Sequence, residues 1–249
     1  MERCAFIMKE NKWLVIVKGL IIGATMIVPG VSGGTMAIIL GIYDRLIGAV
    51  SSFHKNVREN LLFLGLFVLG AGAGMFLFSA PLSWFLENYQ APTICFFILV
   101  VICGIPSIGK KSGVSKVTIS VVLYLLLGAA LVVTISRMPG DFFALKSGAQ
   151  KGGWFSLLIA GISSAVALIL PGISFSHFLL ILGLYDGLLN AIRNLDFGFL
   201  IPLGGGVLLG TFLMSRLLEN FMEKYPKQTY LIILGFIIGS VAELMTKYF

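Results

Sequence analysis

The chain has 249 residues, of which 58% are hydrophobic and only 12% are charged. Soluble domains carry about 25% charged residues, so this composition excludes an ordinary soluble protein. The formal net charge is +7. In a membrane protein such an excess of Lys and Arg reflects the loops held on the cytoplasmic side. No exposed segment interleaves aromatic with basic residues, so a nucleic-acid partner is not expected.

Uncharged stretches mark the segments that can cross a bilayer, because about 20 apolar helical residues span its hydrocarbon core. These stretches are 19–43, 60–86, 88–109, 117–136, 152–185, 197–215 and a shorter one at 228–242. They predict an all-α polytopic membrane protein forming a single membrane domain over residues 1–249. The first apolar run continues into Pro29 without a cleavage site, so we expect it to belong to the mature fold.

The first segment in chain order, 12–50, is predicted to be a broken-helix hairpin that re-enters the membrane. Residues 29–44 read PGVSGGTMAIILGIYD. Pro29 removes a backbone donor, Gly30 tolerates a turn, and Ser32 stands where a returning half-helix wants its N-cap. Free N–H groups at such a helix start, with hydroxyls beside them, favour an anion. The candidate residues of this first tip are Pro29, Gly30, Ser32, Gly33, Gly34 and Thr35.

Two spans, 60–83 and 93–109, follow this hairpin, and an unpaired span over 117–136 comes next. Three cysteines, Cys4, Cys95 and Cys103, lack metal-ligand spacing. Because two of them lie in apolar stretches, we interpret them as small buried packing residues.

The second hairpin, 153–194, repeats the first at an offset of 142 positions. Residues 171–186 read PGISFSHFLLILGLYD. The matches are Pro29/Pro171, Gly30/Gly172, Ser32/Ser174, Ile39/Ile181, Leu40/Leu182, Gly41/Gly183, Tyr43/Tyr185 and Asp44/Asp186. As one helix, residues 152–185 would be about 51 Å long, too long for one span and too short for two. The candidate residues of this second tip are Pro171, Gly172, Ser174, Ser176 and His177.

A second block of the repeat lies at an offset of 136 positions. Gly70-x3-Gly74 matches Gly206-x3-Gly210, a spacing typical of closely packed helices. The spans predicted for this half are 197–215 and 229–247. The chain therefore divides into repeat 1 at 12–109, a linker helix at 117–136 and repeat 2 at 153–248.

A hairpin returns the chain to the side from which it came, so an odd number of crossings separates the repeats and the second is predicted to be inverted. Charge placement supports this, with thirteen basic residues on the inner side and five on the outer side when the N-terminus is cytoplasmic and the C-terminus is outside. Inverted repeats with interrupted helices are typical of secondary transporters. Two tips from opposite faces would converge on one central site. The alternative is that each Pro-Gly merely kinks a structural helix while its Ser bonds to its own backbone.

Two acidic residues, Asp44 and Asp186, follow the returning half-helices, where a carboxylate would oppose a helix C-terminus. They are candidates for pairing with Lys18, Arg45 or Arg193, or for carrying a coupling proton. No cofactor is expected beyond a coupling H⁺ or Na⁺. No metal site is expected either, because His177 has no ligand-spaced neighbours.

The run GLIIGATMIVPGVSGGTMAIILGIYDRLI and its echo PGISFSHFLLILGLYDGLL resemble the PopT-type polyprenyl-phosphate transporter family of bacteria, long catalogued as a domain of unknown function. The resemblance implies a lipid flippase of the cytoplasmic membrane. It would recycle undecaprenyl phosphate, the lipid carrier of cell-wall precursors, from the outer to the inner leaflet. The sequence departs from the family pattern at Phe175 and His177, where small or differently polar residues are expected.

Two other functions stay open. PGISFSH also resembles the Pro-Gly-x-Ser-Arg-Ser segment of undecaprenyl-pyrophosphate phosphatases, which use an arginine and a paired glutamate cluster. Here Phe175 and Gly33 occupy the arginine position, and no acid pair lies within a hairpin. The protein is therefore expected not to be an enzyme. A small-anion transporter would share the inverted anion site. The oligomeric state is not predicted.

Overall fold

The computed structural model describes residues 11–28, 30–114, 118–139 and 153–249. Within these ranges every regular element is a helix, which confirms the all-α class. The first repeat and the linker form α1 (Lys12–Thr25), α2 (Gly33–Ile39), α3 (Tyr43–Ser51), the short η2 (Phe53–Lys55), α4 (Val57–Asn88), α5 (Gln90–Lys111) and α6 (Ile119–Ser136). The second repeat forms α7 (Gly153–Ile169), α8 (Phe175–Ile181), α9 (Tyr185–Asn194), α10 (Phe197–Lys224) and α11 (Pro226–Tyr248).

Five of these helices, α4, α5, α6, α10 and α11, are long and apolar enough to cross a membrane. Each covers most or all of one of the five spans predicted outside the hairpins. Two further pairs, α2 with α3 and α8 with α9, would qualify as spans if each bent pair were counted, although the bends are 115° and 108°. The chain is thus a multi-pass membrane protein.

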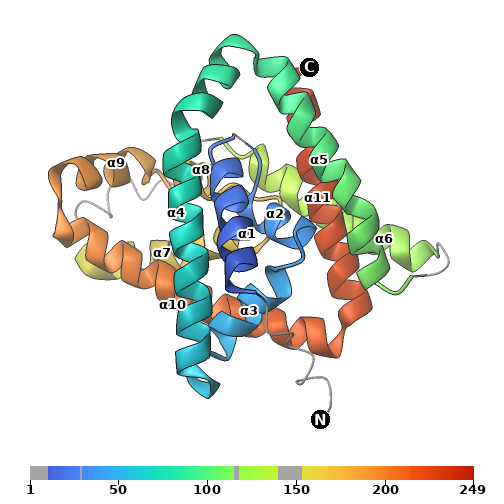
Figure 1. Ribbon diagram of the computed structural model, residues 1–249, viewed down its shortest axis with the longest axis horizontal. Helices are drawn as coiled ribbons and strands as arrows, with labels where there is room; N and C mark the ends of the chain where they lie inside the picture. The colour runs from blue at the N-terminus through green and yellow to red at the C-terminus, as the bar shows by residue number, and fades with distance from the viewer. Residues whose placement is uncertain (1–10, 29, 115–117, 140–152) are drawn as a thin grey trace.

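The predicted span 60–83 is longer in the structure, because α4 continues through Pro81 to Asn88. The predicted length followed the thickness of the bilayer. A helix can extend beyond the hydrocarbon core, however, and at 32 residues α4 is about 48 Å long. Its far end meets the beginning of α5 in an arch at the top of Figure 1.

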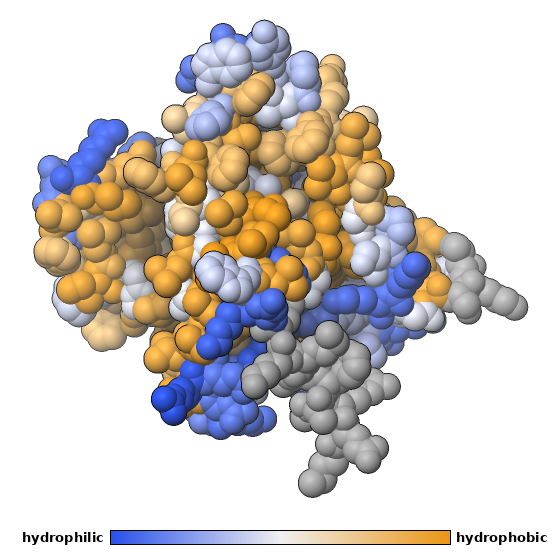
Figure 2. Space-filling model, in the orientation of Figure 1, coloured by the Kyte–Doolittle hydropathy of each residue, from blue (hydrophilic) through white to orange (hydrophobic). Residues whose placement is uncertain are grey.

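The outer surface of the bundle is apolar, as a lipid environment requires. On α4 the side chain of Phe76 is 83% exposed. Figure 2 shows apolar surface across the middle of the molecule, with hydrophilic residues gathered mainly at the lower end, where α4 begins. Cys95 and Cys103 of α5 are exposed as well, so the interpretation of buried packing cysteines was wrong for these two. An apolar stretch in a membrane helix can face lipid as readily as protein. Cys4 lies outside the described residues.

Glycines fix the packing of the first long helix in each repeat. Helix α4 packs on α1 with Gly70 and Gly74 against the Ile16 and Leu20 carbonyls, so that a methyl group at either glycine would collide with backbone. Helix α10 packs on α7 in the same manner through Gly206 and Gly210. The close packing predicted from both Gly-x3-Gly pairs is confirmed.

Helix α11 is the most enclosed of the five long helices, because 61% of its 18-residue apolar stretch is buried inside the protein. It packs on α5 and α6 and passes beside both Pro-Gly loops. Its Leu244 side chain lies against Gly30, and its Phe236 carbonyl lies against Gly172. One helix therefore supports both tips.

A second break in each hairpin, after α2 and after α8, was not expected. Gly41 has φ +69°. Its N–H donates to the Ile38 carbonyl, and the Ile42 N–H donates to the Ala37 carbonyl, the pair of bonds that ends a helix in a Schellman motif. Gly183 has the same φ and the equivalent bonds.

This break corrects the interpretation of the two acidic residues. Asp44 lies in the first turn of α3 and Asp186 in the first turn of α9. A carboxylate is favourable at a helix N-terminus. Neither residue therefore opposes a helix dipole, as the sequence interpretation had supposed.

Candidate functional site

The first tip is the chain between α1 and α2. Helix α1 ends at Thr25, whose hydroxyl donates to the Ile22 carbonyl at 2.8 Å. The chain then turns through Gly30, at φ +84°, which favours glycine because larger residues rarely adopt it. Ser32 follows with extended backbone (φ −82°, ψ 133°) as the N-cap of α2, and its side chain makes no capping hydrogen bond. The Ser32 hydroxyl therefore does not cap the N-terminus of α2.

The second tip has nearly the same backbone. Gly172 also has φ +84°. Ser174 caps α8 with φ −82° and ψ 124°, again without a side-chain capping bond. Both serines therefore stand at the N-cap positions expected from the sequence, but neither hydroxyl bonds to its own backbone there.

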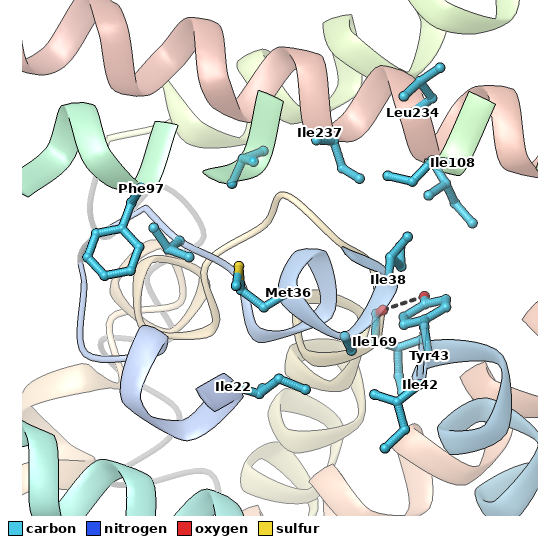
Figure 3. Close-up of a cluster of buried hydrophobic side chains, with 14 of the residues drawn as sticks. Ile22, Met36, Ile38, Ile42, Tyr43, Phe97, Ile108, Ile169, Leu234 and Ile237 are labelled. Carbon is cyan, nitrogen blue, oxygen red and sulfur yellow. Dashed lines mark hydrogen bonds between the residues drawn. The ribbon is translucent and has the colours of Figure 1, made fainter. Parts of the chain in front are cut away.

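The two tips touch each other. The Gly172 N–H donates to the Thr35 hydroxyl oxygen at 3.1 Å, across 137 positions of sequence. Gly34 lies beside Pro171. Two residues before Pro171, the Ile169 carbonyl accepts a hydrogen bond of 2.8 Å from the Tyr43 hydroxyl, which Figure 3 shows in a cluster with the buried Met36, Ile38 and Ile237 side chains. The first hairpin is thus hydrogen-bonded to the second at two points.

The candidate residues differ in how open they are. Gly30 and Ser176 are exposed, and Gly33, Gly34, Ser174 and His177 are half-buried. Ser32, Thr35, Pro171 and Gly172 are buried, and Pro29 lies outside the described residues. The Nε2 atom of His177 is buried and has no hydrogen-bond partner among the described residues. It is an unsatisfied polar atom in the first turn of α8.

This arrangement suits an anion through several small contributions. Helices α2 and α8 have only seven residues each, so their dipoles alone are weak. What the tips offer are the N–H groups at each helix start, the hydroxyls of Ser32 and Ser174, and the His177 ring. The Gly172 N–H is already engaged by Thr35.

Two of the charged candidates, Asp44 and Arg45, form ion pairs with residues outside the tips. The Lys111 amine donates to Asp44 at 2.6 Å, and Arg45 bonds to Glu59 at 2.9 Å. Lys111 was missed because it lies 67 positions away, at the end of α5. Lys18 is half-buried on α1, whereas Asp186 and Arg193 are exposed and form no ion pair with any described residue. Coupling through Asp44 and Asp186 stays a prediction.

Several basic residues assigned to the inner side lie close together. The Asp44–Lys111 and Arg45–Glu59 pairs join α3, the start of α4 and the end of α5 at one end of the bundle. The Lys111 amine also lies 5.7 Å from the Tyr230 ring centroid, near the start of α11. The structure thus brings together charges that the sequence placed on one side.

Two cavities lie away from the tips. One of about 470 Å³ lies under the arch of α4 and α5, lined by Leu82, Phe85, Tyr89, Pro92, Thr93, Phe96 and Phe97. Another of about 300 Å³ lies between α7 and α10, lined by Trp154, Phe155, Leu158, Ile201, Pro202 and Gly205. Both linings are almost wholly apolar, so they suit hydrocarbon and not a phosphate.

The sequence was compared with those of known protein families. Residues 22–248 match the family described as undecaprenyl phosphate translocase-like, which includes both tips and every long helix. The chain belongs to this family. Membership confirms the family resemblance found in the sequence motifs.

Two curated relatives of this translocase-like chain are both named polyprenyl-phosphate transporter. The one from Staphylococcus aureus is 32% identical, over 94% of this chain and 86% of its own length. The one from Vibrio cholerae is 28% identical, over 91% of this chain and 75% of its own length. The comparison with solved structures found no match.

Proposed function

We propose that this protein moves polyprenyl phosphate, in bacteria undecaprenyl phosphate, across the cytoplasmic membrane from the outer to the inner leaflet. The observation that carries the proposal is the contact of the two repeated tips, made by Thr35 with Gly172. It gathers two sets of anion-binding groups inside an apolar bundle. The family match and the names of both relatives support the same substrate.

The chemistry of the ligand agrees with the tips. A phosphate monoester carries about −1.5 to −2 charges at neutral pH and offers strong hydrogen-bond acceptors. Backbone N–H groups, Ser32, Ser174 and His177 are donors for such acceptors. The isoprenoid tail would remain in lipid, against the apolar outer surface of the long helices.

The proposed topology is an inverted pair of repeats with re-entrant hairpins, a cytoplasmic N-terminus and an outer C-terminus. Helix α1 has 14 residues and α7 has 17, lengths of about 21 and 26 Å that fall short of the hydrocarbon core. The charges around α3 and the end of α5 would face the cytoplasm. Each tip would then reach the middle of the bilayer from its own side.

Inward movement of this anion requires a driving force. A negative-inside potential opposes it by about 2.3 kcal/mol per charge per 100 mV, so a dianion faces roughly 4–5 kcal/mol. Cotransport of protons or sodium ions would offset this cost. The sequence nominates Asp44 and Asp186 for that role.

The experiment uses purified protein in liposomes that carry polyprenyl phosphate in one leaflet. Exposure of phosphate in the other leaflet and release of free phosphate are followed in one sample. We expect leaflet exchange without phosphate release, strongly reduced in Ser32→Ala and Ser174→Ala. Ser79→Ala is the matched control, since Ser79 lies exposed on α4 and only donates to the Phe76 carbonyl.

The alternatives give other outcomes. Phosphate release would identify a phosphatase. Transport of inorganic phosphate in place of the lipid would identify a small-anion carrier. Exchange that survives both serine substitutions would show that the tips do not hold the phosphate.

A further inference from the structure

Helix α10 carries a line of polar side chains that the sequence motifs did not include. Thr211, Ser215 and Glu219 are spaced four residues apart and so share one face of the helix. Ser215 is fully buried, and Thr211 and Glu219 are half-buried. Polar and ionisable groups in a membrane helix are costly and indicate function.

The two hydroxyls on this line have no hydrogen-bond partner among the described residues, although both oxygen atoms are buried. A helical Ser or Thr usually bonds to the carbonyl four residues earlier. Ser164 of the neighbouring α7 does so, donating to the Ala160 carbonyl at 2.7 Å. Thr211 and Ser215 do not, so the face of α10 that leads to Glu219 carries two unsatisfied polar atoms.

Glu219 is held by the other repeat. The hydroxyl of Ser51, which is 2% exposed at the end of α3, donates to Glu219 Oε2 at 2.5 Å. The same hydroxyl lies 3.3 Å from the Gly48 carbonyl. When Glu219 is ionised, Ser51 donates to it. When Glu219 is protonated, its O–H donates to the Ser51 oxygen while Ser51 donates to Gly48. The site therefore accommodates both protonation states without rearrangement.

No ion pair fixes the charge of Glu219 within the described chain. On α3 and its neighbours, Asp44 pairs with Lys111 and Arg45 pairs with Glu59. Helix α7 has no titratable side chain. The charged groups of α9 lie near the opposite end of α10, where Gly187 faces Phe199. The remaining titratable groups of α10, of η2 and of the first turns of α11 are Arg216, Glu223, Lys224, His54, Lys55 and Lys227, all exposed, and the half-buried Tyr230.

The packing register places Ser215 and Glu219 between the end of α7 and the charged end of the bundle. Gly206 lies against Leu158 and Gly161, and Gly210 lies against Ile162 and Ala165, so α10 and α7 run in parallel. One further turn brings Ser215 level with the end of α7, at Ile169. The Ile169 carbonyl, two residues before Pro171 of the second tip, accepts a hydrogen bond from the Tyr43 hydroxyl. Glu219 follows one turn later, next to α3.

We propose that Glu219 is the proton-binding residue through which transport responds to a pH gradient, with Ser51 as the hydroxyl that holds its carboxyl group in both protonation states. The proposal rests on the proposed function. During inward transport the Glu219 carboxylate takes up one proton with each lipid phosphate. Glu219 then releases a proton to water at the end of α10. No other bond changes, and the charge of one proton accompanies the lipid phosphate inward.

The two carboxylates nominated earlier are less suited to this role. The Asp44 side chain is 43% exposed and already paired with Lys111. Asp186 is exposed. Both would exchange protons directly with water.

The test uses liposomes that contain a pH-sensitive dye, with polyprenyl phosphate in one leaflet and an imposed pH gradient. For one proton per lipid, a gradient of one pH unit shifts the leaflet distribution by about tenfold. We expect this shift and the accompanying proton signal in the unmodified protein and in Glu223→Gln, an exposed control one turn away. Glu219→Gln, which still accepts the Ser51 hydrogen bond, should lose both. Glu219→Asp keeps an acid and should retain a measurable shift.

Several outcomes would overturn the proposal. Glu219→Gln could keep the full response to the pH gradient. Alternatively, Asp44→Asn or Asp186→Asn could abolish that response while Glu219→Gln does not. A response that follows sodium and not pH would also overturn it. Absence of any lipid movement by the unmodified protein, in contrast, would refute the proposed function itself. A melting curve of each variant in detergent separates loss of coupling from loss of fold.

Discussion

The two hairpins have the same backbone and different attachments. Gly30 and Gly172 share φ +84°, and Gly41 and Gly183 share φ +69°. The first hairpin is fastened at Thr35, Tyr43 and Asp44, and its α3 packs against α4 and against α10 of the other repeat. The second hairpin's α9 packs mainly on α8 and α10 of its own repeat. The two hairpins therefore share a backbone conformation but differ in their side-chain bonds and in the helices they pack against.

This difference indicates that the two hairpins have different roles. The first hairpin is anchored by buried hydrogen bonds, whereas the second presents exposed Ser176, exposed Asp186 and the unpaired His177 Nε2. Substitutions at features that both repeats share should have equal effects. Substitutions at the attachments should affect the first repeat alone.

The largest effect is expected where the repeats are alike. Gly74→Leu and Gly210→Leu each drive a side chain into backbone of the neighbouring helix. We expect a loss of roughly 3 kcal/mol or more of folding free energy in both, since overpacking against backbone cannot relax. Thermal unfolding in detergent measures it. The matched controls are Gly72→Leu and Gly204→Leu, where nothing lies within 4 Å, and a large loss in these would refute the packing explanation.

The next largest effect is expected at Thr35 and His177, which occupy equivalent positions in the two tips. Thr35→Val removes the acceptor of the buried Gly172 N–H and should cost about 1–3 kcal/mol. At the equivalent position, His177→Leu removes a buried atom without a partner, so it should be neutral or stabilising while it weakens phosphate binding. Stability and leaflet exchange are measured on both proteins. Equal destabilisation by the two changes would argue against the asymmetry.

A smaller effect is expected at the two tyrosines. Tyr43→Phe loses the buried bond to Ile169 and should cost about 1 kcal/mol. Tyr185 is half-buried and has no hydrogen bond with any described residue, so Tyr185→Phe should stay within about 0.5 kcal/mol. Paired melting curves decide this. The prediction fails if the second substitution costs as much as the first.

The smallest effect is expected at the aspartates. Asp44→Asn breaks a pair with side chains 43% and 32% exposed, so its cost should be about 0.2–1 kcal/mol at low salt and should fade at high salt. Asp186→Asn breaks no ion pair with a described residue and should lose only the about 0.3 kcal/mol that an exposed carboxylate contributes at the start of α9. Melting temperatures across a salt series provide the readout. A salt-dependent loss in Asp186→Asn as large as that in Asp44→Asn would contradict the prediction.

Much of the fold could be predicted from the sequence, because bilayer thickness fixes the length of an apolar span and a repeat of Pro, Gly, Tyr and Asp marks a duplicated backbone. The tips could be located because Pro and Gly act on the chain locally. The second break in each hairpin, after α2 and α8, was missed. A glycine such as Gly41 inside an apolar run does not by itself predict that a helix ends there in a Schellman motif. Lys111 and Ser51 could not be assigned, because their partners depend on how helices 67 and 168 positions away are packed. The four-residue spacing of Thr211, Ser215 and Glu219 was visible, but its meaning required the register of α10 on α7.

The most direct test of the central claim, that both tips hold the phosphate together, is photo-crosslinking with a polyprenyl phosphate whose reactive group lies beside the phosphate. The account predicts labelled peptides from both 30–35 and 172–177, with unlabelled polyprenyl phosphate competing and the uncharged polyprenol failing to compete. Label confined to one tip, or found at the arch of α4 and α5 in place of the tips, would contradict it.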